Sequence, residues 1–226
     1  MPDGAIAILG GTGDQGLGLA LRFCAAGRRV VIGSRKLDRA VEAAANVGEQ
    51  VPGAKVLGLE NGGAAAGAEI VILSVPFEHT AGTLESIRER LEPGQIVVSM
   101  GVPLATAVGD AASRMIGVWQ GSCAELVQSL VPEGVHVVSA FQNVSAHRLQ
   151  TLADPVECDV VVSGAKEPRT QVMELCRLVP GLRGIDGGPL SNARIVESIT
   201  ALLIGLNIRY RVSEGIGVRF TGLSAQ

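Results

Sequence analysis

The sequence has few aromatic residues, no long apolar run and no excess of basic charge. Phenylalanine, tyrosine and tryptophan make up 3% of the 226 residues, whereas 47% are hydrophobic, so the core must consist mainly of valine, isoleucine, leucine and alanine. An aliphatic core suits parallel strands that helices bury on both faces. The formal net charge is −3. Because nucleic-acid binding normally uses a basic surface, we predict no nucleic-acid partner.

Cysteine and histidine are scarce and scattered. The four cysteines, Cys24, Cys123, Cys158 and Cys176, lack the paired spacings of metal sites, and the three histidines do not cluster with them. We therefore expect buried, unpaired cysteines and no metal. The apolar stretch ITALLIGL (199–206) is too short to span a bilayer, and no basic start of a secretory signal precedes the first apolar run. We predict a cytoplasmic protein that does not enter a membrane.

Short β-branched runs alternate with helical patterns along most of the chain. The predicted strands are residues 5–9, 28–33, 54–59, 69–75, 95–100, 135–141, 158–164 and 183–186, and the predicted helices are residues 15–26, 36–48, 80–91, 122–130 and 168–178. Such alternation is typical of βαβ units. From Gly187 onward the pattern is that of one long helix. We predict an α/β fold in which residues 1–180 form a Rossmann-type, mostly parallel sheet with helices on both faces, and residues 181–226 form a small C-terminal helical domain.

A glycine-rich loop joins the first predicted strand to the first predicted helix. Its residues Gly11, Gly13 and Gly16 form the pattern G-x-G-x-x-G. In dinucleotide-binding proteins the first glycine allows a tight turn, the second lets a pyrophosphate approach the backbone, and the third lets helix and strand pack closely. The order strand, loop, helix makes an ordinary connecting turn the weaker alternative. We predict a dinucleotide site here.

The end of the second predicted strand indicates which dinucleotide binds. NAD enzymes place Asp or Glu there for the ribose hydroxyls, but this chain has Ser34 and Arg35, with Arg39 one helical turn later. A guanidinium can bind a 2′-phosphate in a bidentate manner. The alternative is a solvated, basic start of a helix. The pattern favours NADP.

Several blocks together resemble one family. LGGTGDQG (9–16), VIGSR (31–35), VPFEH (75–79) and above all GGPLSNARIVESITALL (187–203) resemble the NADPH-dependent reductases of coenzyme F-420, an 8-hydroxy-5-deazaflavin. The resemblance runs along nearly the whole chain. The last block is its most specific part, because general Rossmann physics does not require it. The resemblance implies an NADP-binding domain and a small helical domain, with the deazaflavin stacked on nicotinamide between them, and a homodimer.

The resemblance also implies roles for individual residues, in addition to those of Gly11 and Gly16. They are Thr12, Gly13, Asp14 and Gln15 at the pyrophosphate; Ser34, Arg35 and Arg39 at the 2′-phosphate; Phe77, Ala81 and Val102 bordering the cofactor; Gln142, Val144 and Ala146 facing nicotinamide and deazaflavin; and Ile216 against the deazaflavin. Two positions depart from family members. Phe77 stands where some have tryptophan, and Gln142 stands where histidine is common; glutamine can hydrogen-bond a carbonyl but carries no proton at neutral pH.

The predicted reaction is reversible hydride transfer between NADP(H) and the deazaflavin, which needs position and orientation but no proton relay. No Ser-His, Tyr-Lys or paired-carboxylate arrangement stands out, whereas ketone reduction normally needs a general acid. Three alternatives remain: an NADPH-dependent flavin or metal reductase, a reductase of small imines or hydroxy acids, and a non-catalytic NADP redox sensor. The imine and hydroxy-acid reductases usually carry a longer helical domain, and a sensor needs no second cofactor pocket.

Other residues have simpler interpretations. His79 fits a cap of the following helix as well as a cofactor contact. Arg194 and Glu197 lie one turn apart and can form a surface ion pair. We expect the single tryptophan, Trp119, to pack in the structure rather than stack on a ligand. The apolar segment IVESITALLIGLNI (195–208) predicts a helix that buries one face against the body or against a second subunit.

Overall fold

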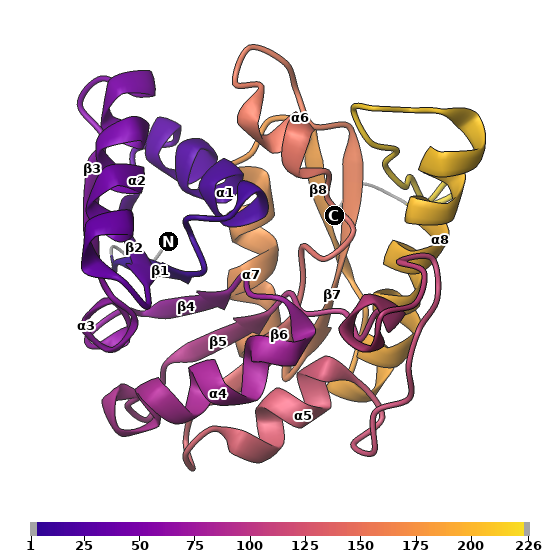
Figure 1. The fold of residues 1–226 in the computed structure, drawn as a ribbon, viewed down its shortest axis with the longest axis horizontal. Coiled ribbons are helices and arrows are strands. Elements are labelled where there is room, and N and C mark those ends of the chain that lie inside the picture. Colours follow the sequence, from indigo (N-terminus) through magenta and orange to yellow (C-terminus); the bar gives the residue numbers. More distant parts are fainter. Residues whose placement is uncertain (1–3, 224–226) are drawn as a thin grey trace.

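The computed structural model describes residues 4–223, and its strands form a single sheet (Figure 1). The strands are β1 (Ile6–Leu9), β2 (Arg29–Ser34), β3 (Lys55–Glu60), β4 (Ile70–Leu73), β5 (Ile96–Ser99), β6 (His136–Ser139), β7 (Cys158–Gly164) and β8 (Leu182–Asp186). Their order across the sheet is β3-β2-β1-β4-β5-β6-β7-β8. All neighbouring pairs are parallel except β6 and β7, which are antiparallel. The order of the first six strands is that of a Rossmann dinucleotide-binding fold.

Helices cover both faces of this sheet. They are α1 (Asp14–Ala25), α2 (Leu37–Gln50), α3 (Asn61–Ala65), α4 (Phe77–Ile87), α5 (Cys123–Leu130), α6 (Ala146–Gln150), α7 (Lys166–Arg177) and α8 (Ala193–Tyr210), with 3-10 turns at Arg88–Arg90, Ala105–Val108 and Leu190–Asn192. Alternate strand residues serve the two faces: Ile6 and Ile8 pack with α1, α2 and α7, whereas Ala7 and Leu9 pack with α3, α4 and α5. The predicted α/β class is therefore confirmed, with an aliphatic core.

Most predicted elements are found within a few residues of their expected bounds, and the differences have local causes. The helix expected at 80–91 begins earlier, directly after Pro76, whose fixed φ of −54° suits the residue before a helix. Helices α3 and α6 have five residues each and are too short to show a helical period in the sequence. The four cysteines are buried and unpaired, as predicted. Trp119 is 99% exposed, so the expectation that it packs in the structure is wrong for this chain.

The C-terminal part of the chain begins with the edge strand β8 and continues into α8, which lies at the end of the molecule opposite β3 (Figure 1). After α8 the backbone turns at Arg211, which has a left-handed φ of 55°, and runs back toward β7. There the hydroxyl of Ser145 donates to the carbonyl of Glu214, and the guanidinium of Arg148 donates to the carbonyl of Gly215. The division into two domains at residue 180 stays a prediction.

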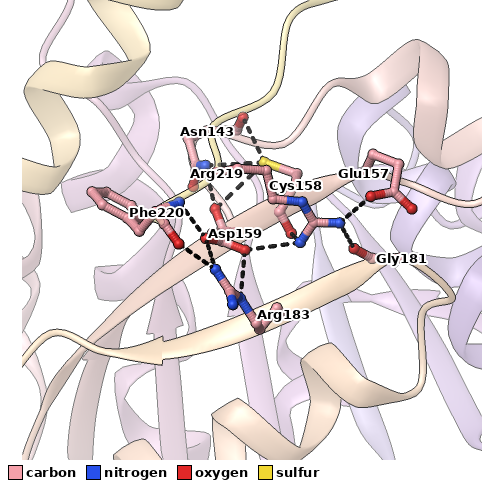
Figure 2. Close-up of polar contacts among 8 residues, drawn as sticks. All are labelled: Asn143, Glu157, Cys158, Asp159, Gly181, Arg183, Arg219 and Phe220. Atoms are coloured by element: carbon pink, nitrogen blue, oxygen red, sulfur yellow. Dashed lines mark hydrogen bonds and ion pairs between the residues drawn. The ribbon is translucent and has the colours of Figure 1, made fainter. Parts of the chain in front are cut away.

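A buried carboxylate fixes this returning segment. Asp159 accepts hydrogen bonds from Arg183 (2.7 Å), from Arg219 (2.8 Å) and from the backbone N–H of Phe220 (2.7 Å), as Figure 2 shows. Arg219 also donates to Glu157. Burial acts to raise the pKa of Asp159, but the hydrogen bonds from Arg183, Phe220 and Arg219 outweigh it and lower that pKa to about 2. Asp159 is thus an ionised anchor that joins β7, β8 and the returning segment.

We predict that Asp159→Asn lowers the free energy of unfolding at pH 7 by about 2 kcal/mol, because it leaves two guanidinium groups without their carboxylate. This loss is smaller than is typical for breaking a fully buried ion pair, because the side chains of Arg183 and Arg219 are 38% and 36% exposed. The pKa of Asp159 is lower in the folded state than its ordinary value of 3.8. Its contribution is therefore complete above that value and is lost as the pH falls toward 2.

Urea denaturation of the wild type and of Asp159→Asn, at pH 7 and at pH 3, measures the difference between their free energies of unfolding. This difference should be smaller at pH 3. Asp110→Asn is the control, because the Asp110–Arg114 pair is 50–70% exposed and its loss should change stability by less than about 1 kcal/mol. An Asp159→Asn effect of equal size at both pH values would contradict the assignment.

Candidate functional site

Two adjoining cavities lie where the strand order reverses, beyond the carboxyl ends of β1 and β4. This is the place where open α/β sheets bind their ligands. The larger cavity, of about 680 Å³, is lined by Gly10, Thr12, Gly13, Ser34, Arg35, Lys36, Arg39, Asn61, Ser74, Val75, Pro76, His79 and Thr83. The smaller cavity, of about 330 Å³, is lined by Gly13, Asp14, Gln15, Ser74, Val75, Pro76, Phe77, Met100, Gly101, Val102, Leu104, Gln142 and Thr200. The two share the residues around Gly13 and Pro76.

The glycine loop forms the boundary between the cavities, and its glycines serve different purposes. A Cβ on Gly16 would lie 2.7 Å from the Cα of Gly11, so Gly16 allows α1 to pack against the loop. Gly10 has a φ of +79°, which favours glycine. A Cβ on Gly13 would meet nothing closer than 3.4 Å within the protein. The protein itself tolerates a side chain at Gly13, and a Cβ there would instead fill the space in front of the helix N-terminus. This fits the close approach of a pyrophosphate.

Positive charge gathers in the lining of the larger cavity. The side chains of Arg35, Lys36 and Arg39 line it, and within residues 4–223 none of them forms a hydrogen bond or an ion pair. Ser34 is 8% exposed, and its hydroxyl accepts from the N–H of Lys36. Unpaired cations beside a hydroxyl suit a phosphate group.

Asn61 also faces this cavity. Its Oδ1 atom is buried and has no hydrogen-bond partner in the described part of the chain. Asn61 therefore brings a buried acceptor without a partner to the wall of this cavity. A nucleotide supplies hydroxyl and amino donors that such an acceptor can take.

The smaller cavity is mainly apolar, and Gln142 lies in its wall. This residue is 6% exposed; its Nε2 donates to the hydroxyl of Ser139, and its buried Oε1 has no partner among the described residues. Asp14 is the one lining residue with a titratable side chain, since the lining contains no His, Lys, Tyr, Cys or Glu. The cavity can thus hold a planar, uncharged ring system with an N–H donor, but it offers no obvious proton relay.

The turn that carries Gln142 is strained and is held from several sides. Phe141 has a left-handed φ of 67°, which is uncommon for a residue other than glycine. Gln15 donates to the carbonyls of Phe141 (3.1 Å) and Val144 (2.9 Å), and Thr200 donates to the carbonyl of Gln142 (2.9 Å). Asn143 donates to the carbonyl of Asp159 at 2.8 Å (Figure 2). Helices α1 and α8 and strand β7 thereby fix one turn in the cavity wall.

Arg22 supports the continuation of this turn from α1. It is 3% exposed, and its guanidinium donates to five carbonyls, those of Arg148, Leu149, Thr151, Leu152 and Asp154. Desolvation lowers the pKa of Arg22, while Asp154 acts in the opposite direction. The carbonyls at the end of α6 are satisfied in this way, which secures the segment after Ala146.

The structure brings most of the predicted site residues together, and some lie elsewhere. Thr12, Gly13, Asp14, Gln15, Ser34, Arg35, Arg39, Phe77, Val102 and Gln142 line the cavities. Gly11 lies in the loop and Gly16 lies in α1, packed against Gly11; neither lines a cavity. Val144 is buried behind the turn, Ala146 begins α6, Ala81 is exposed on α4, and Ile216 donates its N–H to Asn207; these four do not line either cavity. The cofactor contacts of all these residues stay predictions.

Sequence reasoning missed several lining residues. Asn61 and the segment Ser74–Pro76 follow β3 and β4, and their position after a buried strand was the available signal. Thr200 reaches the smaller cavity from α8, and nothing local in the sequence indicates this. His79 lines the larger cavity, and its side chain does not cap α4. Glu197 is 1% exposed and bonds to α5, so the simple interpretation of a surface pair with Arg194 is wrong.

Comparison with known proteins identifies the family. The profile of the family described as NADP oxidoreductase, coenzyme F420-dependent, matches residues 5–103. The F420-dependent NADP reductase of Methanocaldococcus jannaschii is 49% identical over 223 residues, which cover 96% of this chain and 98% of that protein. The reductase of the same name from Methanothermobacter thermautotrophicus is 44% identical, covering 98% and 96%. The chain belongs to the F420-dependent NADP reductases.

Solved structures agree with this membership. A protein from an Arthrobacter strain, assigned as an F420-dependent NADP reductase, superposes with a TM-score of 0.75 at 25% identity, over 92% of this chain and 96% of that one. The 3-hydroxyisobutyrate dehydrogenase of Mycobacterium tuberculosis superposes with a TM-score of 0.58 at 16% identity. This second likeness covers 93% of our chain and 67% of the dehydrogenase and shows the fold alone. This chain thus shares its fold with part of a longer dehydrogenase.

Two further observations concern what the chain contains. Within residues 4–223, no helix has the length and apolar character needed to cross a membrane. The same residues contain no group of three or more His, Cys, Asp or Glu side chains that could hold a metal ion.

Proposed function

We propose that this chain is an oxidoreductase that catalyses reversible hydride transfer between NADP(H) and coenzyme F-420. One observation carries the proposal: two cavities meet at Gly13 and Pro76, one lined by unpaired cations and the other mainly apolar around Gln142. Near-full-length similarity to reductases named for both compounds supports it. A flavin or metal reductase and a non-catalytic sensor are the alternatives.

The larger cavity has the residues needed for NADP. The N–H groups at the start of α1 face the space beside Gly13, where the pyrophosphate would lie, and no side chain caps this helix. Arg35 and Arg39, with the Ser34 hydroxyl, would hold the 2′-phosphate. The uncompensated charge of these arginines supports this role, since a purely structural arginine usually has an acceptor.

The smaller cavity has the features needed for the second ring system. When bound, nicotinamide and deazaflavin supply the hydride donor and acceptor themselves. The protein then has to hold the two rings in place and keep water out. Phe77, Met100 and Val102 supply apolar walls, and the free Oε1 of Gln142 can accept from a ring N–H or a carboxamide. The scarcity of titratable groups in this cavity favours transfer between cofactors over carbonyl reduction, which needs a general acid.

We further propose that the protein is a homodimer that uses α8. The side chains of Ile195 and Leu202 lie two turns apart on this helix and are 62% and 60% exposed, and Ile199 lies between them. Ile195 and Ile199, but not Leu202, line an apolar hollow of about 340 Å³ together with Val161 and Ile185. Apolar surface of this kind is typical of subunit interfaces.

The cytoplasmic location of the protein also stays a prediction.

We predict that Arg35→Ala weakens NADPH binding by roughly ten- to a hundredfold, because it removes a charge-assisted contact to phosphate worth about 1.5–3 kcal/mol. Binding of NADH should change little, since NADH lacks the 2′-phosphate. Fluorescence titration with both nucleotides measures the two affinities. Arg29→Ala, at the opposite end of β2, is the control and should alter neither. Equal losses for NADPH and NADH would exclude the 2′-phosphate role.

We predict that NADPH reduces coenzyme F-420 at least about tenfold faster than FMN or FAD, because a site with one matched hydrogen bond discriminates by about 1.4 kcal/mol or more. Stopped-flow absorbance with the three acceptors at equal concentration measures the rates. Comparable or faster reduction of FMN or FAD would support the flavin-reductase alternative. Tight NADPH binding without reduction of any acceptor would support the sensor.

We predict the mass of a dimer by light scattering at micromolar concentration, and a shift toward the monomer in Leu202→Glu, because a buried, unpaired carboxylate opposes association. Val41→Glu is the matched control, since Val41 is a similarly exposed apolar residue on α2. A monomeric wild-type protein would refute the dimer. A dimer that persists in Leu202→Glu would exclude this face of α8.

A further inference from the structure

Glu197 is a buried carboxylate that joins two helices. It lies on α8 and is 1% exposed. Its Oε2 accepts from the N–H of Cys123 at 2.9 Å, and its Oε1 accepts from the N–H of Ala124 at 3.1 Å. Both N–H groups belong to the first turn of α5, where helices have donors without intrahelical partners. The cap residue Ser122 satisfies a third donor, that of Glu125. A side chain from α8 therefore completes the N-terminus of α5.

This arrangement is costly for a contact that serves packing alone. Glu197 has no cationic partner among the described residues, and burial raises its pKa to about 7, while its two hydrogen bonds act in the opposite direction. The groups that face it are the carboxylate of Glu125 and the thiol of Cys123, with the hydroxyls of Ser99 and Thr80 behind that thiol. A leucine at this position would bury α8 without this cost. The carboxylate instead fixes the position of α8 relative to α5, because both of its oxygens accept from fixed N–H groups.

The same two helices form part of the smaller cavity. Thr200 lies three residues after Glu197 on α8, lines the cavity, and donates to the carbonyl of Gln142 at 2.9 Å. On the α5 side, a Cβ added to Gly101, another lining residue, would lie 2.5 Å from the sulfur of Cys123. The first turn of α5 thus supports the cavity floor while Glu197 sets the position of α8 relative to it. The bond from Thr200 is 2.9 Å long and O–H···O bonds rarely exceed about 3.0 Å, so a shift of α8 by one residue's rise, about 1.5 Å, would break it.

We propose that Glu197 is a positioning residue for the deazaflavin pocket: it holds α8 against α5 at the height where Thr200 bonds the turn that carries Gln142. The inference rests on the proposed function, because it concerns the second of the two cofactors. It assigns Glu197 no contact with either cofactor. The larger cavity contains no residue of α5 or α8, so the NADP site should not depend on Glu197.

The test is a double-mutant cycle of Glu197→Ala and Thr200→Val. Each single variant should raise the KM for coenzyme F-420 by about five- to twentyfold, and the double variant should be no worse than the more severe single one, because both remove the same support. The Kd for NADPH, measured by fluorescence titration, should stay within about twofold of the wild type and serves as the check of folding. Glu197→Gln keeps one acceptor and should restore part of the loss.

Glu133→Gln is the matched control, because it removes an exposed carboxylate beyond the opposite end of α5, and it should leave the KM unchanged. Additive effects in the cycle, or an NADPH Kd that rises as much as the KM, would overturn the inference. Should Glu197→Ala not fold, Glu197→Gln takes its place in the cycle, with a smaller rise in the KM and the same lack of additivity with Thr200→Val. A wild-type protein that fails to reduce coenzyme F-420 would overturn the proposed function and this inference with it. An active wild type with unaffected variants would overturn the inference alone.

Discussion

The strained turn at Phe141 is the constraint on which the rest of the site depends. A left-handed backbone at a residue other than glycine costs free energy and persists only where the surroundings impose it. Gln15 supplies two hydrogen bonds to this turn from the first turn of α1, and Thr200 supplies another from α8. The glycine loop and the C-terminal helix therefore act on the same turn. Because hydrogen bonds from both α1 and α8 hold the strained turn, displacement of either helix would change the wall of the smaller cavity.

Local chemistry explains which parts of this site could be predicted from the sequence. The pattern around Gly11, Gly13 and Gly16 was informative because a tight turn, a close approach and a close packing contact each need glycine within a few residues. Arg35 and Arg39 could be recognised because one follows β2 directly and the other lies one helical turn later, in the first turn of α2. The alternation of strands and helices likewise reflects neighbouring residues and gave the fold class.

The parts that could not be predicted depend on contacts between distant segments. Glu197 and Cys123 are far apart in the sequence, and only the topology brings a polar residue of an apolar helix to the end of another helix. Thr200 reaches the cavity for the same reason. Trp119 was misjudged because a large aromatic side chain normally packs, whereas it lies exposed in the long connection between β5 and α5. Residue type alone does not show which polar side chains the fold will enclose.

The returning C-terminal segment has a consequence for the order in which the two cavities form during synthesis. The larger cavity is lined entirely by residues between Gly10 and Thr83, which leave the ribosome early, and chains generally fold from the N-terminus as they emerge. The turn of the smaller cavity continues into Ser145 and Arg148, which bond to carbonyls of Glu214 and Gly215. Those carbonyls emerge much later. A nascent chain thus contains every residue that lines the larger cavity before it contains the segment that holds the wall of the smaller cavity.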